Sequence, residues 1–361
     1  FLDFTIIFLV RGRQLLANKY VVSAAALFLF MIFGTVSNVA LNGTSEFKDQ
    51  LVFSVIHLQL LLAFVLGIYL FNKLKNSFVF QILLWTIFLL SFRLFTDDIE
   101  NAFNLSSVRG LRVESFFAGG ANNFALIVGV GFLINFFSEK RSLKKVILGF
   151  YFLIIIILTM SRGALFGLVF ALFVTAVFDI ERKTLSMLLK VSMFLALSIF
   201  LSILVFDELQ MYFEKFSERF LGVFTGEATL TQASSGRGLI ISDLYYNHLK
   251  HASLFQWLFG HGLGSISFMV NGYPYESSHN VIVDILFRNG ILVLFFFMLL
   301  ILAVFFNFLK KRGTVDLRVF SIFIFLHFEL LVNPFIYAAQ TGWIYTLFLA
   351  LFISQKRLVK K

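Results

Sequence analysis

The sequence contains no cysteine, only 2 prolines and few charged residues. Without cysteine the chain forms neither a disulfide nor a thiolate site, and its redox compartment cannot be inferred. Charged residues make up 14% of the chain and hydrophobic residues 59%, with a mean hydropathy of +0.91. Apolar runs such as 146–160 and 291–307 recur along the whole chain, which excludes an ordinary soluble domain.

These runs predict an all-α polytopic membrane protein with about 11–12 transmembrane helices. The predicted spans are 1–10 (in part), 20–41, 51–71, 78–94, 116–137, 146–160, 164–180, 190–206, 280–309, 319–333 and 335–354. The chain opens on Phe1 rather than on an initiator methionine, so we expect preceding residues and a first helix. No cleavable signal peptide is visible.

The basic residues carry topological information. The net charge is +10, but the basic residues fall in short clusters between apolar runs, which argues against nucleic-acid binding. Alternate loops hold 20 of the 30 Lys and Arg, and we assign them to the cytoplasm: "RGRQLLANK", "NKLKNS", "SEKRSLKK", "ERKTLSMLLK", "KKRGTVDLR" and "QKRLVKK". One orientation therefore satisfies every loop.

The opposite side has one large loop between two late spanning helices. We divide the chain into transmembrane helices with short loops (1–206), this loop (207–279) and C-terminal transmembrane helices (280–361). The middle of the loop, "LIISDLYYNHLKHASLFQWLFG", predicts one or two amphipathic helices on the membrane surface. "SSGRG" and "GHGLGS" flank it as glycine-rich turns.

Two arginines at or near the non-cytoplasmic face are candidates for anion binding. Arg162, in "TMSRGALFGL", falls at the tip of a hairpin between two apolar runs. It either snorkels to the interface or meets an anion there. Arg237, in "ASSGRGLI", is either a solvated loop residue or a phosphate ligand, since a guanidinium favours bidentate phosphate contacts.

The stretch "SSHNVIVDILFRNG" carries the candidate base. His279 stands where a spanning helix begins, and histidine ordinarily titrates near neutral pH, so it could accept a proton from an arriving hydroxyl. Asn280 would cap the helix or orient the ring, and Asp284 would hold the imidazole. A simple capping turn with a solvated histidine is the alternative, and Glu276 is a rival base.

Further polar groups lie near the same face. Asn122 and Asn123, in "FFAGGANNFAL", either serve close helix packing or meet a sugar or phosphate. Glu329 either faces the same cavity or pairs locally with His327. The loop histidines only faintly suggest a metal, and we predict neither a metal nor a cofactor.

The order of these motifs resembles a known family. "SRG" at a hairpin tip, a long loop with "SGR", "GHGLG" and "SSHN", and then "NGIL" resemble the O-antigen polymerase and O-antigen ligase superfamily of bacterial inner-membrane glycosyltransferases. "FAGGANNFAL" resembles that family's glycine-asparagine helix start. His279 and Gly290 fit the ligase signature of a His, ten residues and a Gly. The ligase pattern also has a Leu four residues after an Arg, where this chain has Phe166 or Ile241.

The resemblance implies a GT-C-like membrane enzyme whose site faces the periplasm. Its donor would be an oligosaccharide on undecaprenyl diphosphate, transferred to an acceptor hydroxyl without a metal or nucleotide sugar. Arg162 and Arg237 would match the family's diphosphate-binding arginines, and His279 its catalytic histidine. Membrane lipid, a chain-length regulator and a flippase are the partners to expect.

We therefore predict an O-antigen or capsule polymerase that joins lipid-linked repeat units. The Phe-rich, Lys-rich composition suits an AT-rich polysaccharide locus. The alternatives are an O-antigen ligase that moves the chain to lipid A-core and a flippase for the same lipid-linked sugars. A flippase is less favoured, because its charges would follow a central path, whereas here they gather at one face.

Overall fold

The computed structural model describes residues 19–42, 47–74, 76–102, 120–138, 142–159, 161–179, 237–262, 268–270, 273–275, 277–337 and 341–354. This part of the chain is almost entirely α-helical, which confirms the predicted fold class. A small antiparallel hairpin, β1 (Phe268–Val270) and β2 (Tyr273–Tyr275), was not predicted. It pairs Phe268 with Tyr275 and Val270 with Tyr273.

Apolar helices lie at the predicted spans within the described residues. They are α2 (Lys19–Asn42), α3 (Phe47–Lys73), α4 (Asn76–Ala102), α5 (Ala121–Phe136), α6 (Leu143–Leu158), α7 (Arg162–Phe178), α13 (Val281–Lys310), α14 (Leu317–Val332) and α15 (Gly342–Ser354). By length and composition, Ser54–Phe71 and Val281–Lys310 are long and apolar enough to cross a membrane. Shorter apolar helices are Val21–Ser37, Ser77–Phe92, Ala121–Phe136, Arg162–Phe178 and Gly342–Ser354. The predicted spans 1–10 and 190–206 lie outside the described residues.

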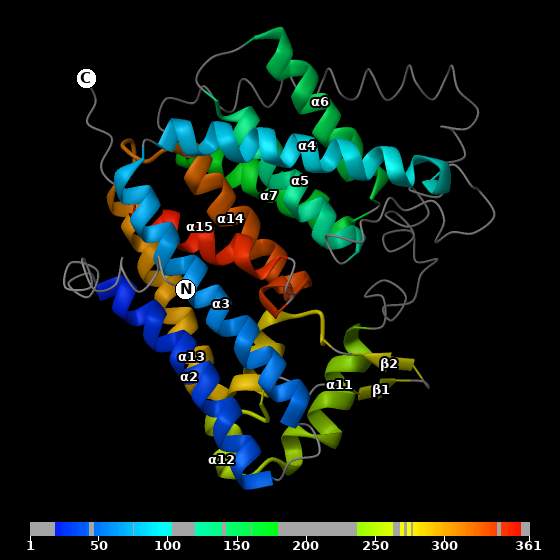
Figure 1. The fold of residues 1–361 in the computed structure, drawn as a ribbon, viewed down its shortest axis with the longest axis vertical. Helices are drawn as coiled ribbons and strands as arrows, with labels where there is room; N and C mark the ends of the chain where they lie inside the picture. Colours follow the sequence, from blue (N-terminus) through cyan, green and yellow to red (C-terminus); the bar gives the residue numbers. More distant parts are fainter. Residues whose placement is uncertain are drawn as a thin grey trace.

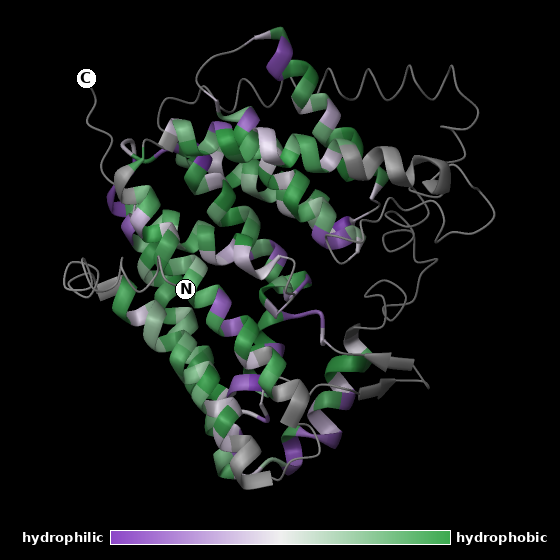
Figure 2. Ribbon diagram, in the orientation of Figure 1, coloured by the Kyte–Doolittle hydropathy of each residue, from purple (hydrophilic) through white to green (hydrophobic). Residues whose placement is uncertain are grey.

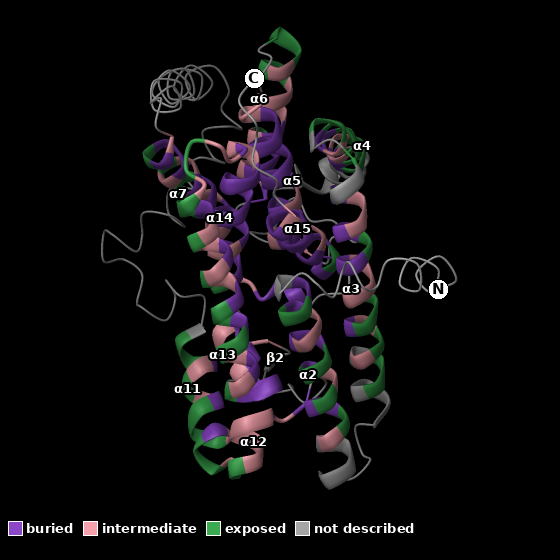
Figure 3. Ribbon diagram, turned by 90° about the vertical axis from the view of Figure 1, so that its left-hand side faces the viewer, coloured by how far each residue is buried: buried purple, intermediate pink, exposed green. Residues whose placement is uncertain are grey.

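Helix α14 lies at the centre of the molecule (Figure 1) and contacts α5, α7, α13 and α15. Helix α15 packs against α3, and α2 packs between α3 and α13. The helices are apolar over most of their length (Figure 2), whereas burial is concentrated in α5, α14 and α15 (Figure 3). Outer faces carry exposed apolar side chains such as Leu89 and Phe173, as expected for surfaces that contact lipid.

Polar side chains define where several helices begin. The side chain of Ser161 accepts from the backbone N–H of Ala164 at the start of α7, and Asp316 accepts from that of Arg318 at the start of α14. Each satisfies one of the N–H groups that a helix leaves unpaired at its N-terminus. These caps fix helix ends that hydropathy alone places only approximately.

The described part of the large loop folds into short helices beside α13. They are α11 (Arg237–Asn247), a 3₁₀ turn (Leu249–His251) and α12 (Leu254–Phe259). Ile240 and Leu244 of α11 are fully buried and pack in one cluster with Phe287 of α13. Ser253 and Gln256 form a capping box at the start of α12. The loop helices are therefore tied to the first turns of α13.

The prediction of one continuous helix over 335–354 is wrong at its start. A 3₁₀ turn, η3 (Phe335–Tyr337), comes first, and α15 begins only at Gly342. Pro334 lies between α14 and α15, and its missing N–H explains why α14 does not continue through it. The hydroxyl of Thr341 donates to the carbonyl of Phe335 at 3.1 Å, which closes the turn before α15.

Helix α13 is interrupted at Gly290, which has φ 79° and ψ 177°. A Cβ at this position would lie 2.3 Å from the carbonyl oxygen of Leu258, at the end of α12. Reciprocally, a Cβ at Gly260 would lie 2.3 Å from the carbonyl oxygen of Arg288. The N–H groups of His261 and Gly262 donate to the carbonyls of Phe287 and Arg288 at 2.8 and 2.9 Å. These loop N–H groups therefore satisfy carbonyls that the interruption of α13 leaves without a donor from their own helix.

We predict that Gly290→Ala destabilises the fold. The backbone conformation is one that essentially only glycine adopts, at a cost on the order of 1–3 kcal/mol for another residue, and the Leu258 carbonyl adds a clash. Thermal unfolding of the purified protein in detergent measures the effect. Gly120→Ala is the matched control, because Gly120 also has a positive φ (109°) but nothing lies within 4 Å of its Cβ position. If both variants lost the same thermal stability, the close packing of Gly290 against the Leu258 carbonyl would not be what stabilises the fold.

Candidate functional site

The turn at residues 277–280 presents His279 in a strained conformation. His279 has φ 57°, and among the described residues it is the only non-glycine residue with a positive φ. Its N–H donates to the hydroxyl oxygen of Ser277 at 3.0 Å. The N–H of Asn280 donates to the hydroxyl oxygen of Ser278 at 3.2 Å, so both serines hold the turn. Strain of this kind gathers at functional sites when the surroundings enforce it.

Asp284 enforces this turn from one helical turn further on. Its side chain is fully buried. One carboxylate oxygen accepts from the N–H of Ser278 at 2.8 Å, and the other accepts from the hydroxyl of Ser277 at 2.9 Å. From the sequence, we expected Asp284 to hold the imidazole of His279. The structure shows it holding the backbone that carries His279.

Asn280 connects this turn to two helices. Its Oδ1 accepts from the N–H groups of Ile282 and Val283 at 2.9 and 3.3 Å, which caps α13 as expected. Its Nδ2 donates to the carbonyl of Leu331 at 3.2 Å, in the last turn of α14. Asn280 therefore links the start of α13 to the last turn of α14.

The asparagines of α5 meet the same end of α14. The Nδ2 of Asn333 donates to Oδ1 of Asn123 at 2.8 Å, and Asn123 is only 8% exposed. Asn122 is half-buried in the same first turn of α5. The amide of Asn123 thus joins helices, which is the packing role that the sequence left open beside sugar or phosphate binding.

Arg162 begins α7 beside this group. It is half-buried, and the next residue, Gly163, lies directly against the end of α14. A Cβ on Gly163 would lie 2.8 Å from Cγ2 of Val332 and 3.3 Å from Oε1 of Glu329. On Gly167 it would lie 3.1 Å from the same oxygen. The small residues therefore allow the Glu329 carboxylate to approach the N-terminal turns of α7, whose helix dipole favours negative charge.

Glu329 is 1% exposed, so it lies inside the protein near this end of α14. His327 is directed elsewhere. Its Nδ1 lies 2.7 Å from the carbonyl oxygen of Phe323, and its Nε2 lies 3.2 Å from the hydroxyl of Tyr345 on α15. Residues two positions apart on a helix do not face each other. The local pairing of Glu329 with His327 is therefore not favoured, and the Glu329 carboxylate lies beside Gly163 and Gly167 of α7.

Two histidines of the loop, His248 and His261, pack against the ring of Phe287. His261 stacks on Phe287 with ring centroids 4.3 Å apart, and His248 meets the same ring edge-on at 5.5 Å. Burial lowers the pKa of His261, partly offset by a hydrogen bond to the Phe287 carbonyl. Within the described ranges, no group of three His, Cys, Asp or Glu is placed to hold a metal ion. These histidines therefore contribute to packing against α13.

A buried polar layer lies beyond the turn, and the sequence alone gave its residues no role. Arg288 is 4% exposed, and its guanidinium carbon lies 4.8 Å from the ring centroid of Tyr337. The hydroxyl of Tyr337 donates to Oδ1 of Asn289 at 2.6 Å, and the ring of His57 lies 5.7 Å away. The signal was present in "FRNG", since an arginine at membrane level is costly unless it has partners.

The two remaining candidate residues, Arg237 and Glu276, belong to the large loop. Arg237 is the first residue of α11, where the sequence analysis expects a helix to open. Glu276, the rival base, lies outside the described residues. The structure therefore gathers His279, Asn280, Asp284, Asn123 and Glu329 at one end of α14, with the start of α7 beside them.

Comparison with known proteins adds one match. A family model described as O-antigen ligase matches residues 146–298. This segment includes both candidate arginines, His279 and Gly290. No curated protein matches the chain.

We predict that Asp284→Ala loosens the histidine turn. The substitution leaves the buried N–H of Ser278 without its acceptor, which costs about 1–3 kcal/mol, or about 5- to 150-fold in local opening. Hydrogen–deuterium exchange of a peptide covering residues 277–283 should accelerate accordingly. Asp243→Ala is the control, because Asp243 bonds only locally to the exposed Asn247 in the described structure. Unchanged exchange in Asp284→Ala would show that the carboxylate does not hold the turn.

Proposed function

We propose that this chain polymerises polysaccharide repeat units. Residues 146–298 match a family model described as O-antigen ligase, and that family consists of multi-pass inner-membrane glycosyltransferases. The donor is an oligosaccharide on undecaprenyl diphosphate, and the acceptor is a hydroxyl of a second lipid-linked unit. The site faces the periplasm. One observation carries this proposal: Asp284 and Asn280 hold His279 in a strained turn. Asn280 bonds to the end of α14, and the same end packs against Gly163, the residue after Arg162.

His279 is the proposed general base. The oxygen of the acceptor hydroxyl attacks the anomeric carbon of the donor, and the bond from that carbon to the diphosphate oxygen breaks. The proton of the hydroxyl passes to the imidazole, and the bonding electron pair leaves with the diphosphate. A fixed turn supports this role, since a base must hold its alignment with the attacking oxygen. Asp284 acts as a positioning residue through the backbone of the turn.

Arg162 and Arg237 are the proposed diphosphate ligands. Guanidinium groups match phosphate oxygens in two-point contacts and stabilise the charge that develops on the leaving diphosphate. Arg162 lies at the N-terminus of α7, an end that itself favours anions. Arg237 opens α11, which packs in one cluster with Phe287, two turns beyond His279. The diphosphate is a good leaving group, so the proposed mechanism needs neither a metal nor a cofactor.

A ligase is the second candidate. The matching family model carries that description, and His279 and Gly290 have the spacing of the ligase signature. The acceptor would then be lipid A-core, while the donor site would be the same. The polymerase remains our first proposal, since the composition of the chain suits a polysaccharide locus. Chain-length regulator and flippase partners belong to this proposal.

We predict that His279→Ala abolishes chain extension. Loss of a general base lowers the rate by about 10²–10⁴-fold. Arg162→Ala and Arg237→Ala should also lose most activity, because the leaving diphosphate loses charge stabilisation. The test is complementation of a strain lacking this gene, with lipopolysaccharide run on a gel and membrane levels checked by blot. His251→Ala is the matched control, an exposed histidine of the same loop.

The gel separates the candidate functions. A wild-type ladder that collapses to core plus one repeat unit in the three variants supports the polymerase and its site. Bare core, with long chains stranded on the lipid carrier, identifies a ligase. Full ladders from all three variants at normal membrane levels would rule out the proposed site.

We also predict that transfer inverts the anomeric configuration. Attack from the side opposite the diphosphate in a single displacement produces inversion. NMR of the anomeric linkage in the lipid-linked donor and in the polymer measures this directly. Retention of the donor configuration would contradict direct attack and would require a covalent intermediate.

A further inference from the structure

A groove of about 830 Å³ lies between α4 and α6, far from the histidine turn. Its mouth is formed by Ser138, Ser142, Lys144, Lys145 and Arg318, at the ends of α5, α6 and α14 that carry the basic loops. Its walls are apolar and aromatic, with Trp85, Phe88 and Phe92 along α4. The groove therefore has a positively charged mouth and an apolar interior.

The groove and the histidine turn lie at opposite ends of α14. Arg318 is in the first turn of that helix, whereas Leu331, which accepts from Asn280, is in the last. Thirteen residues separate them, or about 20 Å at 1.5 Å per residue. A diphosphate bound beside His279 therefore cannot reach the mouth of the groove.

The groove is long enough for an acyl chain. Its α4 wall runs from Ser77 to Phe92, which is about 22 Å of helix. Half of a hydrocarbon core, the length that one acyl chain spans, is about 15 Å. Trp85 and Phe92 are 57% and 52% exposed, so these rings are open to an occupant. Tyr151 also lines the groove, and its hydroxyl lies 3.3 Å from that of the buried Ser91.

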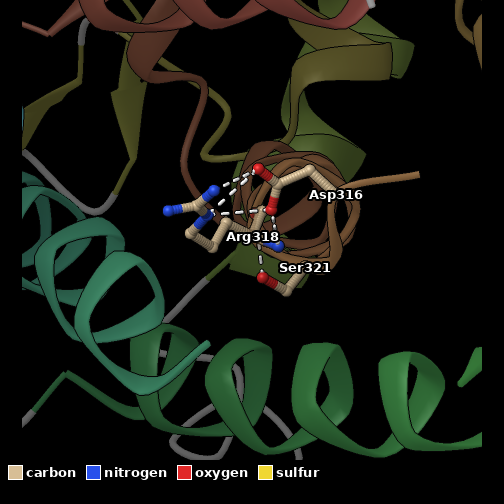
Figure 4. Close-up of polar contacts among 3 residues, drawn as sticks. All are labelled: Asp316, Arg318 and Ser321. Atoms are coloured by element: carbon tan, nitrogen blue, oxygen red, sulfur yellow. Dashed lines mark hydrogen bonds and ion pairs between the residues drawn. The ribbon is translucent and has the colours of Figure 1, made fainter. Parts of the chain in front are cut away.

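The charge of the mouth is carried by two lysines. The guanidinium of Arg318 donates to both carboxylate oxygens of Asp316, with Nε 2.8 Å from Oδ1 (Figure 4), and it lies 4.7 Å from the ring centroid of Phe80. Asp316 therefore matches the charge of Arg318. Lys144 is exposed, and Nζ of Lys145 donates to the hydroxyl of Ser138 at 2.7 Å. No Asp or Glu is among the described residues that line the groove.

We propose that this groove binds one anionic phospholipid of the cytoplasmic leaflet. Its phosphate lies between Lys144 and Lys145, with the hydroxyls of Ser138 and Ser142 as further donors. One acyl chain runs along Trp85, Phe88 and Phe92. Basic pockets between transmembrane helices on the cytoplasmic side suit anionic headgroups, and each lysine near such a surface strengthens binding about fivefold.

The test uses Trp85 as the reporter. The chain has 3 tryptophans, and replacing Trp257 and Trp343 with Phe leaves Trp85 alone in the groove. The full-length protein is reconstituted in phosphatidylcholine vesicles that contain either brominated phosphatidylglycerol or brominated phosphatidylcholine. Bromine quenches tryptophan only at close range. We expect phosphatidylglycerol to quench Trp85 at a mole fraction at least tenfold lower than phosphatidylcholine.

Charge variants decide whether the lysines cause this preference. Lys144→Glu with Lys145→Glu should remove the preference for phosphatidylglycerol, while Lys310→Glu, an exposed lysine at the end of α13, should keep it. Equal quenching by both lipids would overturn the proposal and leave only general lipid contact. A preference that survives in the double variant would also overturn it. Displacement by undecaprenyl phosphate, but not by unlabelled phosphatidylglycerol, would assign the groove to a polyprenyl lipid instead.

Discussion

The close backbone packing of Gly260 and Gly290, each against the segment that carries the other, is the constraint on which the rest of the site depends. Neither position has room for a Cβ, because each faces the backbone of the other segment. The contact divides α13 into two turns that carry Asp284 and Arg288 and a spanning part that begins at Ile291. The loop can therefore lie over the first part without displacing the second. The histidine turn is held in place because the helix that follows it is fixed to the loop.

Burial of polar groups sets the cost of this arrangement. Asp284, Arg288 and Glu329 are each less than 5% exposed, and charged groups inside a membrane protein are retained only where they have partners. Asp284 has two donors, and Arg288 lies against an aromatic face. Asn289 keeps one Nδ2 group buried without a hydrogen-bond partner among the described residues.

Sequence patterns predicted the helical spans because a membrane requires long apolar runs, and they predicted Asn280 as a cap because its position before "VIVD" satisfies helix N–H groups. They did not predict that Asp284 bonds to Ser277 and Ser278, since that depends on the tight turn between them. The backbone packing at Gly260 and Gly290 joins segments thirty residues apart, and no local sequence pattern predicts such a contact. The start of α15 was misplaced because hydropathy does not register the turn that follows Pro334.

The contact between Glu329 and the glycines of α7 bears on how the chain is assembled. Helices enter the membrane in order during synthesis, so α7 is already in place when α14 arrives. A carboxylate makes α14 harder to insert alone, and the space beside Gly163 and Gly167 gives it a protein environment rather than lipid. Insertion of α14 would therefore be easier once α7 is in place, because the space beside the two glycines would shield the carboxylate from lipid.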